Sequence, residues 1–317
     1  MNQQPGEGWA TKQGAANLTP PKTPLLISLA LSSVGYFWRQ AIRDVQDQLK
    51  ITVLAIAILG YVTHTIIDTV KGFHNIGLRK SQPKSYHNFA DNRCWCCSIP
   101  NSSDVLSNIP FIIALYPAWK LYHYEIDLAG EPIFHDSRES IAWFVCFFGT
   151  GLVSLGSAYY HWRPTNSRLV WDRLPMTMSF MSIQYILLTE TLGVEIMMSN
   201  SWLLWGLLVS GFGSVVYWAI FDDLTLYKTV QFLPQMLCPL LLIGFEPIYT
   251  MRGFYVVGLG FYALAKVTEN NDKRIYILTK GVISGHTIKH FCAALALYTF
   301  YFQMMNRIKI LTPQTKI

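Results

Sequence analysis

From residue 103 onward, apolar stretches alternate regularly with short polar loops. Seven of these stretches have about the length of a membrane span, and they cover residues 105–123, 141–161, 172–192, 202–220, 230–247, 252–267 and 281–303. A helix needs about 20 residues to cross about 30 Å of hydrocarbon, and in lipid a helix satisfies its own backbone hydrogen bonds. The pattern therefore predicts an all-α polytopic membrane protein with a seven-transmembrane-helix bundle at 104–303 and a short C-terminal tail at 304–317.

The first hundred residues follow a different pattern. Residues 1–23 are polar and rich in Gly, Pro, Asn and Gln, which predicts a disordered N-terminus. Residues 24–103 hold two short apolar stretches, 24–38 and 51–67, followed by a basic loop. Each stretch could cross the membrane, lie in its interface or act as a signal anchor, and the sequence leaves these alternatives open.

Composition agrees with a multi-pass integral membrane protein. Of the 317 residues, 51% are hydrophobic and 14% are charged, whereas a soluble domain has about a quarter of its residues charged. The net charge of +6 is spread over the loops, which argues against a nucleic-acid partner and favours contact with anionic lipid. The membrane itself is left open: the endoplasmic reticulum or Golgi if the protein is eukaryotic, the inner membrane if it is bacterial. Protein partners cannot be predicted.

Three histidines and an aspartate interrupt the apolar pattern at one side of the predicted bundle. His161 ends the second span and lies four residues after Ser157, so both share one helix face. His286 and His290 open the seventh span with the same spacing, and Asp172 opens the third. Because consecutive spans alternate in direction, we expect these five side chains to converge at one depth.

These residue types together favour a catalytic zinc site. Three histidines with an open fourth position are the ligand set of such a site, where bound water has a pKa of about 7. A carboxylate outside the ligand set can accept the proton of the water, and a hydroxyl can donate to a developing oxyanion. The plainer alternative is that the histidines lie at the interface or hydrogen-bond between helices. The matched pair, with a third histidine and Asp172, favours the metal.

Five blocks of the sequence resemble the alkaline ceramidase family, a branch of the CREST superfamily of seven-helix membrane hydrolases. They are NSSDVLSNIPF (101–111), GSAYYHW (156–162), RLVWDRLP (168–175), the Lys266/Glu269/Asp272 spacing and SGHTIKH (284–290). The blocks occur in the family's order between residues 86 and 303.

The resemblance implies a zinc-dependent lipid amidase. Zinc would bind His161, His286 and His290, Asp172 would accept the proton of the attacking water, and Ser157 would help to stabilise the oxyanion. The substrate would be a membrane lipid, a ceramide-like N-acyl sphingoid base, cleaved to a sphingoid base and a fatty acid.

The sequence departs from animal members of the family in the segment that holds their calcium. Only Asp91, Asn101 and Asp104 remain there and glutamates are missing, so no calcium site is carried over. Lys289 lies between two predicted ligands, and we expect it to snorkel to the membrane interface. Ser107 could join the polar network or cap a helix.

Two other functions stay open at this stage. A seven-helix lipid receptor or binding protein could keep the zinc as a structural centre, and a zinc hydrolase could act on another acyl lipid. Asp172 and Ser157 favour an enzyme, because a structural zinc needs only the histidines.

Overall fold

The computed structural model describes residues 87–123, 127–128, 131–192 and 202–310, together with residues 48–50, 52, 60, 63, 65 and 67–68. The chain divides into two compact units, residues 1–52 and 53–317. In the first, the Thr52 hydroxyl donates to the Gln48 carbonyl at 2.8 Å, a helical spacing. The predicted disordered segment at 1–23, the apolar stretch at 24–38 and most of that at 51–67 lie outside the described residues.

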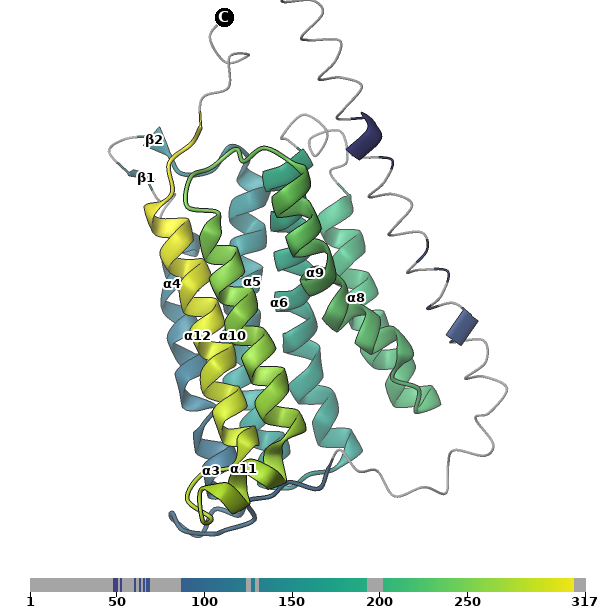
Figure 1. The fold of residues 1–317 in the computed structure, drawn as a ribbon, viewed down its shortest axis with the longest axis vertical. Helices are drawn as coiled ribbons and strands as arrows, with labels where there is room; N and C mark the ends of the chain where they lie inside the picture. The colour runs from purple at the N-terminus through teal and green to yellow at the C-terminus, as the bar shows by residue number, and fades with distance from the viewer. Residues whose placement is uncertain are drawn as a thin grey trace, which may run out of the picture. The chain divides into compact units, whose positions relative to one another are not determined.

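The described part of the second unit is mostly helical (Figure 1). Its helices are α3 (Ser102–Leu106), the 3₁₀ helix η2 (Ile109–Ala114), α4 (Leu115–His123), α5 (Ser137–Trp162), α6 (Asn166–Leu192), α8 (Leu203–Phe221), α9 (Thr225–Gly244), α10 (Gly253–Asn270), α11 (Asp272–Leu278) and α12 (Gly285–Asn306). Between α4 and α5, β1 (Asp127–Leu128) pairs antiparallel with β2 (Glu131–Pro132), with Asp127 opposite Pro132.

Helices occupy the stretches in which spans were predicted, although the first of these is divided. The stretch at 105–123 forms the end of α3, then η2 and α4, because Pro110 and Pro117 lack the N–H groups that one continuous α-helix would use. Among the described residues, α5, α8 and α9 are long and apolar enough to cross a membrane. That all seven stretches cross one stays a prediction.

Two long helix pairs organise the unit. α5 packs along α6, and α10 packs along α12, while α8 and α9 both contact α6. The core between them is built from large apolar and aromatic side chains, among them Trp143, Phe147, Tyr185 and Leu241. α3 and α11 lie at one end of these long helices, and the β1–β2 ribbon lies at the other (Figure 1).

A buried ion cluster lies at the ribbon end. Arg307, the residue that follows α12, pairs with Glu139 of α5 and with Glu190 of α6. The Tyr249 hydroxyl donates to Glu139 at 2.7 Å, and the Tyr255 hydroxyl donates to Glu190 at 2.8 Å. Arg307 fell in the predicted C-terminal tail, but the structure extends the helix to Asn306 and buries the guanidinium directly behind it.

Candidate metal centre

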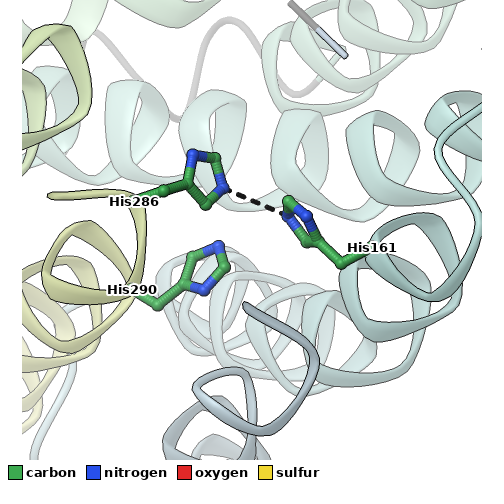
Figure 2. A group of neighbouring side chains, drawn as sticks. All are labelled: His161, His286 and His290. Carbon is green, nitrogen blue, oxygen red and sulfur yellow. Dashed lines mark hydrogen bonds between the residues drawn. The ribbon is translucent and has the colours of Figure 1, made fainter. Parts of the chain in front are cut away.

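Three buried histidines meet where α5 ends and α12 begins (Figure 2). His161 belongs to the last turn of α5, whereas His286 and His290 belong to the first two turns of α12. One ligand nitrogen from each ring lies within 4.8 Å of the other two, and Nε2 of His161 lies 3.2 Å from Nε2 of His286. The structure therefore brings together the predicted ligands, and the group could hold a metal ion.

The start of α12 is fixed by three local features. Ser284 caps the helix, since its hydroxyl accepts the backbone N–H of Thr287 at 3.0 Å. Asp272 Oδ1 accepts the backbone N–H of His286 at 2.8 Å. Gly285 permits a close approach to α10, because a Cβ at this position would lie 2.2 Å from a backbone oxygen of that helix. The backbone that carries His286 is thus held both by its own first turn and by contacts with Asp272 and α10.

Side chains around the rings contact all three histidines. The Ser107 hydroxyl lies 2.7 Å from Nδ1 of His290, which leaves Nε2 of that ring for an ion. Asn101 donates to the backbone carbonyl of His161 at 2.7 Å. Phe89 packs edge-on against His161 and His286, with ring centroids 4.6 Å apart in both cases. Ser107 was a candidate from the sequence, but no pattern marked Phe89, which lies outside the predicted spans.

Asp172 reaches the same site from α6. At Gly156, α5 and α6 approach so closely that a Cβ there would lie 2.0 Å from the carbonyl oxygen of Trp171. This contact brings the Ser157 hydroxyl next to the Asp172 carboxylate. Asp172 lines the same cavity as His161, whereas Ser157 is not part of the lining. The assignment of Ser157 as an oxyanion donor stays a prediction.

The cavity next to the histidines has a volume of ≈ 170 Å³. Its wall includes His161 and His286, together with five charged residues: Asp172, Arg173, Lys266, Glu269 and Lys289. A second cavity of ≈ 120 Å³ has a wall made almost entirely of apolar side chains. The two share Met176, Tyr262 and Ala293. A polar chamber at the histidines therefore adjoins an apolar one deeper among the helices.

The expected position of Lys289 is wrong. Its ammonium donates to Nε2 of His286 at 3.1 Å and to Glu269 Oε1 at 3.0 Å. The other oxygen of Glu269 accepts from Lys266 at 2.8 Å. The sequence gives the direction of the Cα–Cβ bond, but the long side chain of Lys289 bends toward α10, where the carboxylate holds it.

Two carboxylates in the segment before the first predicted span differ in environment. Burial raises the pKa of Asp104 to about 7, although the Thr287 hydroxyl donates to it at 2.9 Å. Burial also acts to raise the pKa of Asp91, but hydrogen bonds from Arg93 and Ser103 outweigh it and hold that pKa below its usual value. Arg93 and Ser103 thus supply the positive charge and the hydroxyl that keep Asp91 ionised.

Comparison with family models, with curated proteins and with solved structures finds no match to this chain. The resemblance to alkaline ceramidases therefore rests on the sequence blocks alone.

Proposed function

We propose that the protein is a zinc-dependent membrane hydrolase that cleaves the amide bond of ceramide-like N-acyl sphingoid bases. The observation that carries the proposal is the three-histidine group beside a cavity that Asp172 also lines. Structural zinc sites are usually closed by four protein ligands, whereas catalytic sites keep one position open. Three histidines next to a chamber fit the catalytic type.

The donor set suits zinc. His161, His286 and His290 would hold the ion through ring nitrogens, and Ser107 would keep the ring of His290 in its binding orientation. Zinc bound there would supply a Lewis acid and lower the pKa of water to about 7.

Asp172 would move the proton in this reaction. Hydrolysis joins the oxygen of water to the carbonyl carbon and breaks the carbon–nitrogen bond, so one proton must pass from water to the departing amine. The carboxylate of Asp172 can accept that proton and return it to the nitrogen. Ser157, whose hydroxyl lies next to the Asp172 carboxylate, would position that group and would donate to the developing oxyanion.

The surroundings of the site suit a lipid. The apolar cavity adjoining the polar chamber can take part of a hydrocarbon chain while the amide lies at the histidines. On the outside, Leu155, Val209 and Ile243 are between 64% and 85% exposed on α5, α8 and α9, the described helices that are long and apolar enough to cross a membrane. A surface of this kind suits contact with lipid. We place the seven helical stretches across a membrane as one bundle, with the substrate supplied by the bilayer.

Zinc content and ceramide turnover, measured on the same detergent-purified preparation, test this proposal. We expect one zinc per chain and release of free sphingoid base from ceramides. Asp172→Asn should keep its zinc and lose about 10²–10⁴-fold in turnover, the usual contribution of a general base. Asp136→Asn is the matched control, because Asp136 caps α5 at its other end and asparagine caps a helix equally well.

Three outcomes would overturn the proposal. Full zinc occupancy in His161→Ala, His286→Ala and His290→Ala alike would remove the ligand set. Turnover of glycerolipid esters alone would replace the amidase by a hydrolase of another acyl lipid. Lipid binding with no turnover would replace it by a receptor.

A further inference from the structure

We propose that Lys289 forms an anion-binding position beside the three histidines, and that this position takes the carboxylate of a long-chain fatty acid. This rests on the proposed function only in that the apolar part of the ligand is a long acyl chain. Nζ of Lys289 lies 3.1 Å from Nε2 of His286, the nitrogen that faces His161.

Lys289 is paired but not neutralised. Glu269 binds Lys289 through one oxygen and Lys266 through the other, at 3.0 Å and 2.8 Å. One negative charge therefore serves two ammonium groups, and this trio keeps a net positive charge. All three residues line the chamber.

Among the described residues of its wall, the chamber also has an excess of positive charge. Its wall holds the cations Arg173, Lys266 and Lys289 and the anions Asp172 and Glu269. The Arg173 guanidinium stacks over the Trp218 ring, with 4.0 Å to the ring centroid. A divalent ion on the histidines would add two further positive charges close to Lys289. Repulsion between charges is stronger inside a protein than in water, so an anionic ligand would stabilise this end of the chamber.

The geometry of the ammonium leaves room for such a ligand. A lysine ammonium has three donor hydrogens, and those of Lys289 have two partners, Glu269 and His286. The third can donate to an oxygen in the chamber. A carboxylate oxygen is the acceptor that gives a charge-assisted hydrogen bond, and these are the stronger ones. The adjoining apolar cavity suits the hydrocarbon chain of the same molecule.

Equilibrium binding of palmitate and of hexadecanol to the protein in detergent tests the position. The two probes share a chain length and differ in charge, and both are measured on chelator-treated and on zinc-loaded protein. Lys289→Met should weaken palmitate binding at least about tenfold and leave hexadecanol binding within about twofold of the wild type. Lys289→Arg should retain palmitate binding, because it keeps the charge. Lys228→Met is the control, since Lys228 is exposed on α9 and does not line the chamber.

Equal palmitate affinity in Lys289→Met and wild type would overturn the inference. A second result would also overturn it. In this result Lys289→Met loses affinity for palmitate and hexadecanol equally, and Lys289→Arg also fails to bind palmitate. Palmitate is not an amide, and its binding to chelator-treated protein requires neither zinc nor turnover. A failure to cleave ceramide would therefore count against the proposed function alone.

Discussion

Two buried polar clusters lie at opposite ends of α5 and α12, and they differ in how their groups are satisfied. His161 and Glu139 are 22 residues apart on α5, which corresponds to about 33 Å of helix. At the Glu139 end, Arg307 meets two carboxylates, and each carboxylate also accepts from a tyrosine hydroxyl. At the His161 end, one ring nitrogen of each histidine lies within 4.8 Å of the other two, and the His161 and His286 rings hydrogen-bond at 3.2 Å.

The two clusters also differ in the volume of the cavity beside each of them. The cavity that reaches Glu190 measures ≈ 10 Å³, whereas the chamber at the histidines measures ≈ 170 Å³. A cluster that is closed by its own ion pairs has little left with which to bind a ligand. Burial of charged groups does not by itself indicate a functional site. The free space beside the histidines makes their cluster the stronger candidate of the two.

The largest effect that separates the two ends should come from Arg307→Met. Removing the guanidinium leaves Glu139 and Glu190 buried without their cation, and breaking a buried pair in this way costs about 3–5 kcal/mol. Thermal unfolding in detergent measures the loss. Zinc content per folded chain should stay at the wild-type value, because the histidines are at the other end.

The matched control for Arg307→Met also neutralises the two carboxylates that lose their cation. Arg307→Met combined with Glu139→Gln and Glu190→Gln should recover part of the lost stability, since no uncompensated buried charge remains. If Arg307→Met unfolded at the wild-type temperature, the ion pairs of Arg307 would contribute nothing to the stability of the fold.

A smaller effect, confined to the histidine end, is expected for Ser107→Ala. The Ser107 hydroxyl lies 2.7 Å from Nδ1 of His290, and losing such a partner typically costs about 10–100-fold in metal affinity. Competition with a zinc chelator measures that affinity. Ser154→Ala is the control, because Ser154 is also buried and its hydroxyl donates only to a carbonyl of its own helix at 2.6 Å. Equal zinc affinities in the two variants would contradict an orienting role for Ser107.

The smallest effect should come from the Arg93–Asp91 pair at the histidine end, in which the carboxylate is buried but the cation reaches solvent. Arg93 is 42% exposed and pairs with Asp91 at 2.7 Å. Arg93→Met should cost about 1 kcal/mol, because the Ser103 hydroxyl still donates to the Asp91 carboxylate. Because the pKa of Asp91 is lowered in the folded protein, its stabilisation is present at neutral pH and is lost as the pH falls below about 4.

Thermal unfolding between pH 6 and pH 3 checks this contribution. The wild-type midpoint should fall more steeply than that of Asp91→Asn, which has no carboxylate to protonate at this position. Parallel curves for the two proteins would show that Asp91 contributes no stability through its charge.

The positions of the long helices could be read from hydropathy, but their boundaries could not. α6 begins at Asn166, six residues before the predicted span, because Thr165 caps it: its hydroxyl accepts the N–H of Arg168 at 3.3 Å. The polar residues of that first turn looked like a loop because they do not face the core. A span was also predicted to run unbroken from 105 to 123, although Pro110 and Pro117 within it carried the signal for a division.

The histidine cluster was predictable because spacing and chain direction both constrain it. Residues four apart share a helix face, and alternating helices bring an end and a beginning together. The Arg307 cluster was not, since its partners are 117 and 168 residues away and no local pattern links them. The position of Lys289 was also missed, because a flexible side chain follows its charge partner rather than the direction of its Cβ.

Asp272 connects the candidate metal centre to a neighbouring segment of the chain. One of its oxygens accepts the backbone N–H of His286 and the other accepts that of Ala90, each at 2.8 Å. The segment that carries Phe89 and the helix that carries a candidate metal ligand are thus held by one carboxylate. By linkage, a partner that binds this segment and changes the affinity for an ion on the histidines has its own affinity changed by that ion by the same factor.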